Sequence, residues 1–302
     1  MERSQRKSKS GATRARGGRP AAAARARSRR PIVFGHPEES YAKLSTQPLY
    51  VLVFLLPLLI AYEIGSALYL SGDGHGGAAR VIRAEGLLTQ FFRWFGVGGL
   101  YLPGIALVVV LLIWHMMTRA KWTIRLPVLG WMFVESLAWT PPLVVLLQFV
   151  GRLASSGSGA ATTAAALAGA PAGSGATGVV AAGGLEAMSV AERATIAVGA
   201  GLYEELLFRM LAIAGVHIVA SDLMGMKDKW ARLVAVVCSA AAFGWYHDVI
   251  LPTGGVDWAR LMIFFLAGLY FGGIYVIRGF GIVVATHALY DLAVLILLPS
   301  GR

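Results

Sequence analysis

Apolar residues run in long, nearly uninterrupted stretches along most of this chain. Residues 48–70, 101–118 and 126–150 each approach or exceed the ~20 apolar residues that a helix needs to cross a bilayer. Such segments must be helical, because lipid satisfies no backbone hydrogen-bonding group. The pattern therefore predicts an all-α fold, a polytopic transmembrane helical bundle of about seven spans. We place these spans near residues 49–70, 100–118, 127–150, 193–220, 232–248, 259–277 and 280–298.

Composition supports a membrane protein and separates off the N-terminal end. Hydrophobic residues make up 57% of the 302 positions and charged residues only 14%, with a mean hydropathy of +0.65, whereas soluble domains are roughly 45–50% apolar. Residues 1–31 hold 11 Lys or Arg and one acid, Glu2, and so supply ten of the net +11 charges. With no apolar period, this stretch cannot bury enough surface to fold. We predict that residues 1–47 form a disordered basic cytoplasmic tail.

The basic tail has no interleaved aromatic residues and ends just before a membrane span. Anionic lipid headgroups are therefore the expected partner, at ~1 kcal/mol per basic residue near the surface, and no nucleic acid is expected. Positive charge next to the first span also places the N-terminus in the cytoplasm. An organelle transit peptide is the alternative, because it too is rich in Arg and Ser and poor in acids.

The later loops agree with this orientation except for one. Segments 119–125 and 227–232, with Arg278, carry Lys or Arg on the sides expected to be cytoplasmic. Residues 71–99 would lie outside, although they carry basic residues at Arg80, Arg83 and Arg93. Leu and Phe are interspersed with these residues, and this pattern predicts an amphipathic helix that lies in the membrane interface.

Low-complexity sequence divides the chain. Residues 151–189 form an Ala/Gly/Ser-rich linker loop between N-terminal transmembrane helices at 48–150 and a core at 190–302. Nearly every intramembrane ionisable residue follows this linker, so function is expected there. The lone Cys238 excludes an intramolecular disulfide and a Cys-based metal site, and we predict that it is a small core residue.

Charges at membrane depth are costly and by default indicate a functional site. The first cluster is Glu204-Glu205 followed by Arg209. Glu205 and Arg209 are four residues apart and share a helix face, so we predict a structural ion pair. Glu204 is rotated about 100° away and lacks that partner, which suits a general acid or base. The alternative is that both carboxyls only hold helices together through Arg209.

Two further clusters follow the same four-residue spacing. Phe243 and His247 share a face after a run of small residues that allows close helix packing; an interfacial His beside Asp248 is the alternative. His287 and Asp291 suit a shared metal, an oriented His or oxyanion stabilisation; a buried His capped by its own Asp is the alternative. The other histidines lack comparable partners and are expected to be structural or exposed: His36, His75, His115 and His217.

Together the three clusters supply a base, imidazoles and a neutralising Arg, which suffice for water attack on an amide with or without a metal. At residues 190–298 they resemble the CPBP family of CAAX-protease and bacteriocin-processing membrane peptidases, also called the ABI family. The matching motifs are Glu204, Glu205 and Arg209, then Phe243 and His247, then His287 and Asp291. Order and spacing between the helices both fit this family.

The resemblance implies a catalytic set of Glu204, His247, His287 and Asp291. In it, Glu204 activates water with help from His247, while His287 and Asp291 stabilise the oxyanion or bind metal. The same four residues are the implied ligands of a Zn²⁺ ion. Asp291 stands where CAAX-cleaving members have Asn, so it must be protonated, coordinate a metal or orient His287; we favour the metal.

We therefore predict an intramembrane endopeptidase, of CAAX-protease-like metallopeptidase type, that hydrolyses a membrane-associated protein or peptide. One alternative is a non-catalytic membrane scaffold or bacteriocin-immunity-type partner protein, since a fold does not determine a function. Another is an ion or metal transporter, which the lack of an evident internal repeat disfavours. The family's distribution suggests a bacterial cytoplasmic membrane, with an endomembrane or organelle location as the alternative.

Overall fold

The computed structural model describes residues 40–70, 82–99, 101–155, 188–251 and 254–297. Its elements there are helical, and the only extended pairing among these residues is an isolated bridge between Ile250 and Val256. The predicted all-α fold is confirmed. The predicted basic tail, apart from its last few residues, and most of the predicted linker lie outside the described residues.

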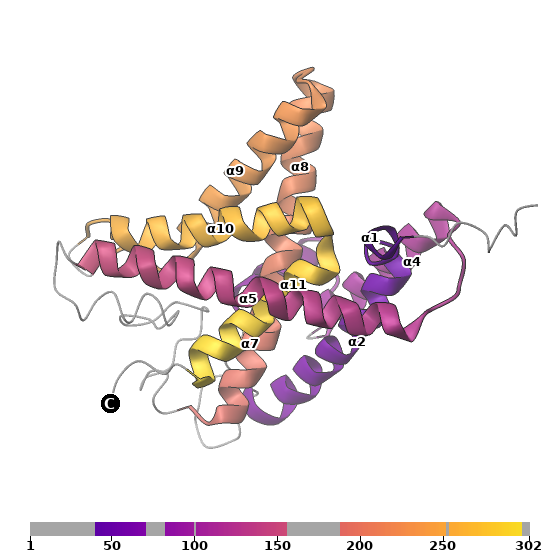
Figure 1. Cartoon of the computed structure of the whole chain (residues 1–302), viewed down its shortest axis with the longest axis horizontal. Helices are drawn as coiled ribbons and strands as arrows, with labels where there is room; N and C mark the ends of the chain where they lie inside the picture. The colour runs from indigo at the N-terminus through magenta and orange to yellow at the C-terminus, as the bar shows by residue number, and fades with distance from the viewer. Residues whose placement is uncertain (1–39, 71–81, 100, 156–187, 252–253, 298–302) are drawn as a thin grey trace, which may run out of the picture. The chain divides into compact units, whose positions relative to one another are not determined.

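The helical elements follow one another in the order shown in Figure 1. They are α1 (Tyr41–Leu44), α2 (Pro48–Gly65) with its π-helical end η1 (Ser66–Leu70), α3 (Arg83–Trp94), α4 (Leu102–Thr118), α5 (Leu126–Ser155), α7 (Val190–Glu205), the π-helical η3 (Leu206–Ala212), α8 (Ile213–Ile218), η4 (Val219–Leu223), α9 (Asp228–Tyr246), α10 (Trp258–Arg278), α11 (Phe280–Leu292) and η5 (Ala293–Leu297).

Five helical segments of the described chain are long and apolar enough to cross a membrane. They are Pro48–Leu70, Leu126–Leu153, Val190–Leu223, Trp258–Arg278 and Phe280–Leu297. Two of the predicted spans form helices that do not meet this standard. α4 is apolar but only 17 residues long, and α9 begins with the charged residues Asp228, Lys229 and Arg232, which reduce its apolar length.

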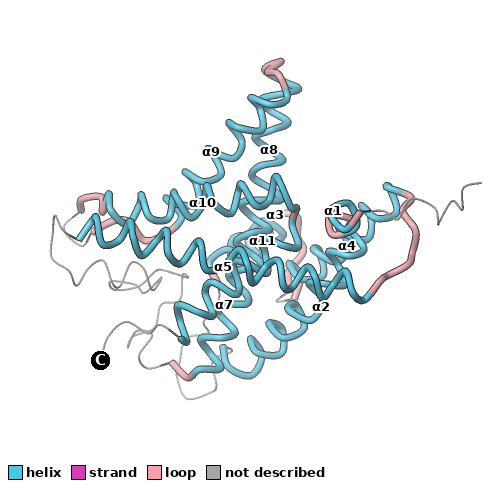
Figure 2. Tube along the Cα trace, in the orientation of Figure 1, coloured by secondary structure: helices cyan, strands magenta, loops and turns pink. Residues whose placement is uncertain are grey.

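The helix α11 is the most enclosed part of the fold. It packs against α7, α5, α10 and α2, and its residues 282–284 are completely buried. Figure 2 shows the same arrangement as a trace, with α5 and α10 side by side and α8 beside α9. The helix that carries His287 and Asp291 is therefore central, and α7, which carries Glu204 and Glu205, packs directly on it.

Small residues let these helices approach until their backbones touch. A Cβ placed on Gly201 of α7 would lie 2.8 Å from the backbone nitrogen of Ala288 in α11. A Cβ on Gly268 of α10 would lie 2.9 Å from the Cα of Ala240 in α9. Such contacts are typical of membrane helices, which gain little from burying apolar side chains and depend on close packing instead.

Large apolar side chains cover the outside of the bundle, as expected for surfaces that face lipid; Leu56, Ile60 and Val109 are examples. Cys238 lies on this exposed side, so the prediction that it is a core residue is wrong. The reason is that Ala235, Ser239 and Ala240 form the inward face of α9, and Cys238 falls on its outward, apolar face.

The predicted amphipathic helix is present as α3. Its first two turns bury Ala84, Glu85 and Leu88, while Trp94 and Phe95 near its end are exposed. Arg80, which the prediction also included, lies outside the described residues. One face of α3 therefore packs on the bundle and the other carries aromatic side chains suited to an interface.

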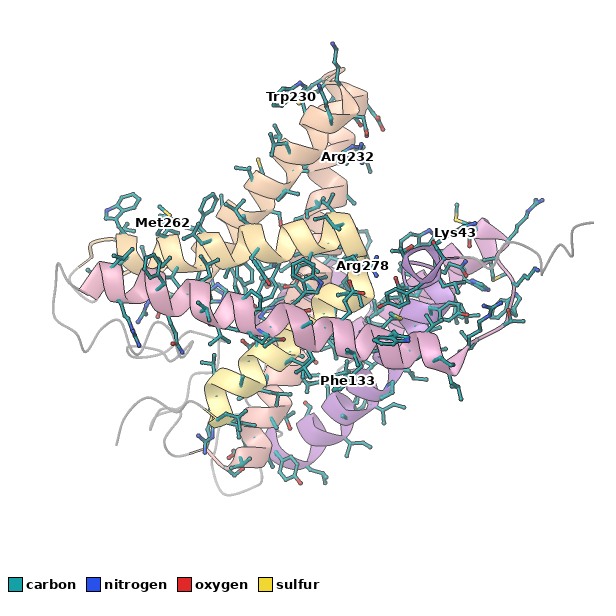
Figure 3. All side chains as sticks on the ribbon, in the orientation of Figure 1. Lys43, Phe133, Trp230, Arg232, Met262 and Arg278 are labelled. Carbon is teal, nitrogen blue, oxygen red and sulfur yellow. The ribbon has the colours of Figure 1, made fainter. Side chains whose placement is uncertain are left out.

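Among the described residues, two polar networks, largely in partly buried positions, tie helices together. At the end of α10, the Arg278 guanidinium donates to both carboxylate oxygens of Glu135, and the Tyr41 hydroxyl donates to the same carboxylate at 2.6 Å. Figure 3 labels Arg278 at this end of α10. Across α2, α3 and α7, the Tyr62 hydroxyl donates to Glu85 and the Tyr203 hydroxyl to Glu63.

The contact between α7 and α11 gives a first prediction. We expect Gly201→Ala to lower stability by about 1–3 kcal/mol, because the new methyl group meets backbone and forces the helices apart. The matched control is Gly273→Ala in α10, where nothing lies within 4 Å of an added Cβ. Thermal unfolding in detergent, followed by tryptophan fluorescence, measures both variants. Equal midpoints for the two would contradict the packing described here.

Docking of α3 should depend on pH through Glu85. Burial raises the pKa of Glu85 to about 7, against 4.5 for an unperturbed Glu. Below pH 4.5 the carboxyl is protonated in both the folded and the unfolded state, so native stability does not vary with pH there and is at its highest. Between pH 4.5 and 7 the unfolded form ionises first, and native stability falls as pH rises. We expect Glu85→Gln to remove this component. Hydrogen exchange of residues 83–94 at pH 5 and pH 8 tests it, and an unchanged pH dependence in the variant would refute it.

Candidate functional site

Glu204 and Glu205 lie at the junction where α7 passes into the π-helical segment η3. A capping box of Ser189 and Glu192 begins α7 and satisfies its first backbone donors. Both glutamates are buried, with only 1% of Glu204 exposed. Single turns of π-helix inside α-helices are frequent at functional sites, because the extra residue redirects side chains. The junction therefore presents two adjacent carboxyls to the bundle interior.

Glu205 joins two helices through its two oxygens. Its Oε2 lies 3.0 Å from the Nε of Arg209, and both side chains are fully buried. Its Oε1 is 2.7 Å from the Nδ1 of His287 in α11. Arg209 also lies over the Phe243 ring, with its Cζ 4.3 Å from the ring centroid. The charge of each group is thus matched by a neighbour, as a water-excluded interior requires.

His247 lies just beyond α9 and not within it. The helix ends at Tyr246, and His247 is its C-cap residue with an extended backbone, so the expectation that His247 lies within the helix is wrong, although its ring meets that of Phe243 at 4.6 Å. Its Nδ1 nevertheless lies 2.8 Å from the Phe243 carbonyl oxygen, and its ring stacks on Phe264 at 3.7 Å. A carbonyl only accepts, so Nδ1 carries the hydrogen and Nε2 is left as the free nitrogen. This Nε2 lies 4.0 Å from Glu204 Oε2.

His287 and Asp291 both project from α11. The His287 ring stacks on Phe271 at 4.4 Å, and its Nδ1 is held by Glu205. Its Nε2 lies 3.9 Å from Glu204 Oε2 and 3.5 Å from Asp291 Oδ2. The ring position is therefore defined by an aromatic face and a carboxylate, with Asp291 next to the nitrogen that faces Glu204.

Three clusters that are distant in sequence thus meet at one buried point. Glu204 Oε2 lies 4.0 Å from one imidazole nitrogen and 3.9 Å from the other. A gap of this size is spanned by one water molecule that makes two hydrogen bonds of about 2.8 Å. The arrangement can hold a water between a carboxylate and two imidazoles, which is the geometry needed to make water a nucleophile.

The positions of the His and carboxylate side chains bear on whether the site fits the expected Zn²⁺ ion. His and carboxylate groups are the ligand types that Zn²⁺ prefers. However, the part of the chain that the structure describes contains no group of three or more His, Cys, Asp or Glu side chains placed to hold a metal ion. The residues as positioned do not fit a bound metal. Zn²⁺ remains a prediction from the resemblance.

Sequence reasoning missed two residues beside the site. Arg83 was assigned only to the interface and Tyr246 to nothing, yet the Arg83 Nη1 donates to the Tyr246 carbonyl at 2.6 Å. The adjacency of Tyr246 to His247 is the one sequence signal that could have found it.

His217, expected to lack a comparable partner, lies 3.0 Å from Asp228 at the α8–α9 turn. His115 is buried against Trp122.

Glu204 and His287 lie on two helical segments that are long and apolar enough to cross a membrane, and His247 reaches the same point from the end of α9. Residues 186–293 match the family model described as type II CAAX prenyl endopeptidase Rce1-like. The match covers about a third of the chain, is consistent with the CPBP resemblance, and contains every residue of the site. The protein is an integral membrane protein. No curated protein and no solved structure matches the chain.

The Glu205–Arg209 pair predicts a specific pattern of stability. Arg209→Leu should lower stability by about 3–5 kcal/mol, because it leaves the Glu205 charge buried without a cation. The double variant Glu205→Gln with Arg209→Leu should recover much of this loss, since neither group then carries an unpaired charge. Unfolding in detergent with increasing denaturant measures the three proteins. A double variant less stable than Arg209→Leu would contradict this account.

Proposed function

We propose that this protein is an intramembrane endopeptidase that hydrolyses a peptide bond of a membrane-associated protein or peptide with water activated by Glu204. The observation that carries the proposal is the position of Glu204 Oε2, about equidistant from His247 Nε2 and His287 Nε2 at 4.0 and 3.9 Å. These groups lie on the segment that matches a protease family. Burial of all three excludes bulk water, which strengthens each polar contact.

In the first step, Glu204 accepts a proton from the water held between it and the imidazoles. The water oxygen then attacks the scissile carbonyl carbon, one C–O bond forms, and the carbonyl π electrons move onto its oxygen. His247 assists because its Nδ1–H is fixed on the Phe243 carbonyl, so its Nε2 is available to orient the water. A positioned base of this kind contributes typically 10²–10⁴-fold in rate.

His287 is the group assigned to the oxyanion. Its Nδ1–H is held by the Glu205 carboxylate and its ring by Phe271, and Nε2 faces the reacting centre before substrate arrives. Carboxylates lie next to both ring nitrogens, so we assign His287 the protonated imidazolium form, in which Nε2 also carries a hydrogen that it can donate. Preorganised donors of this kind stabilise charge that develops in the transition state. The C–N bond then breaks, and the proton carried by Glu204 passes to the leaving nitrogen.

We assign to Asp291 the role of orienting His287. Its Oδ2 lies 3.5 Å from His287 Nε2, within the same helix and one turn away. Of the three roles left open by the sequence, this is the one that the positions of the two side chains support. An Asp in this role keeps the imidazole facing Glu204 when substrate is absent.

The substrate and the location belong to the same proposal. The family description names prenyl endopeptidases of CAAX sequences, which supports a prenylated C-terminal peptide as the first probe.

We place the protein in a bacterial cytoplasmic membrane with a cytoplasmic N-terminus and with the basic tail near anionic headgroups. A cavity of about 480 Å³ supports this orientation, because Thr46, Trp114, Arg232 and Gly279 line it together. These residues flank the segments that positive charge assigns to the cytoplasm.

The decisive experiment replaces Glu204 by Gln in protein reconstituted into liposomes. We expect cleavage of a farnesylated CAAX peptide, or of a membrane-anchored peptide library, to fall by 10²-fold or more, with unfolding unchanged. Glu63→Gln is the matched control, because it alters a carboxyl on α2 that is bound by Tyr203 and lies outside the site.

Metal content of the wild type and of His287→Ala is measured on the same preparations. Zn²⁺ present in the wild type and lost with His287 would make the enzyme a metallopeptidase. Absence of cleavage by wild-type protein on every probe would favour the non-catalytic scaffold instead.

A further inference from the structure

We propose that Tyr246 is a further residue of this site: its hydroxyl donates a hydrogen bond to Glu204, and Arg83 of the interfacial helix α3 holds it in place. This assigns a positioning role to Tyr246, because it acts on the reaction through Glu204. The inference rests on the proposed peptidase function, and it goes beyond the residues of the three motifs.

The first observation is a pair of unmatched polar atoms. Tyr246 is 8% exposed and Glu204 1% exposed. Among the described residues, neither the Tyr246 hydroxyl nor Glu204 Oε1 makes a hydrogen bond of normal geometry. A buried polar group without a partner costs free energy. One of these atoms is a donor and the other an acceptor, so each can satisfy the other.

The second observation is that the two groups are electrostatic neighbours. The Glu204 carboxylate, the Arg83 guanidinium and the Ala84 backbone all act on the Tyr246 hydroxyl. Glu204 Oε2 is the oxygen that faces His247 and His287. Oε1 is therefore the oxygen that we assign to Tyr246. A hydrogen bond there would fix the rotation of the carboxylate and keep Oε2 directed at the imidazoles.

The third observation is that the Tyr246 ring is enclosed on several sides. The rings of Phe208 and His247 meet it edge to face at 5.1 and 5.2 Å. Arg83 places its guanidinium carbon 5.1 Å from the ring centroid and donates to the Tyr246 carbonyl at 2.6 Å. This combination of a cation–π contact and a backbone hydrogen bond leaves the ring little freedom.

Arg83 is the first residue of α3, whose later residues expose aromatic side chains. The side chain that holds Tyr246 is therefore carried by the helix suited to the membrane surface. A change in how α3 packs would reach Glu204 through one residue, Tyr246. This makes Arg83 a positioning residue as well, acting through Tyr246.

The test is Tyr246→Phe, which removes the hydroxyl but keeps the ring and its packing. With the farnesylated CAAX peptide or whichever library peptide the wild type cleaves, we expect kcat to fall about 10- to 100-fold with KM within about twofold. The acidic limb of the pH profile should move to higher pH, because the carboxylate loses a hydrogen-bond donor. Tyr270→Phe, which removes a partly buried hydroxyl bound to the Trp139 carbonyl, is the matched control and should leave kcat and the pH profile unchanged.

Arg83 is tested through a double-mutant cycle. Arg83→Gln should lower kcat in the wild-type background, Arg83→Lys should lower it less, and Arg83→Gln should have little further effect once Tyr246 is Phe. Additive effects of the two changes would overturn the claim that Arg83 acts through Tyr246. An unchanged kcat and pH profile in folded Tyr246→Phe would overturn the role of Tyr246 itself.

A second readout needs no substrate and separates this inference from the peptidase function. Infrared difference spectra between low and high pH contain a carboxyl band that is identified by its loss in Glu204→Gln. We expect this band to shift in Tyr246→Phe and not in Tyr270→Phe. A shifted band without any cleavage by the wild type would support the hydrogen bond while refuting the peptidase. Cleavage that depends on Glu204, with no shift in Tyr246→Phe, would do the reverse.

Discussion

A charge can lie inside this bundle only if another charge or a strong hydrogen bond matches it. The series of side-chain contacts from Arg209 through Glu205 to His287 meets that condition. It links η3, α7 and α11 over contacts of 3.0 and 2.7 Å. Because Glu205 is neutralised by Arg209 and bound by His287, the adjacent Glu204 is the carboxylate without a cation of its own, and it is the one to which we assign the activation of water. Two neighbouring residues of the same type therefore have different partners and, in the proposed mechanism, different tasks.

Around these polar side chains, aromatic rings take the place that water would have at the site of a soluble protein. Phe264 stacks on His247, Phe271 stacks on His287, and Phe243 lies under Arg209. Each ring restricts one polar side chain to one orientation without offering it a competing hydrogen bond. The polar contacts of the site are consequently few and directional, which is the condition under which preorganisation lowers a reaction barrier.

Much of this arrangement can be predicted from the sequence, because its signals are local. Uninterrupted apolar stretches predict the helices, and spacing by four residues places Arg209 beside Glu205. Other features depend on long-range packing that spacing does not encode. The end of α9 before His247, the position of Cys238 and the contact of Arg83 with Tyr246 all follow from which face of a helix meets its neighbours. A single sequence without its partners in space does not contain that information.

The backbone contacts at Gly201 and Gly268 have a consequence for access. At Gly201, α7 touches α11, and at Gly268, α10 touches α9, so closely that even one methyl group has no room. An extended polypeptide is far wider than a methyl group, so a substrate of the proposed peptidase would not reach Glu204 through either of these two seams. The tight joints that align the carboxylate with its imidazoles also close two of its approaches, and they restrict the entry route to the remaining sides of the bundle.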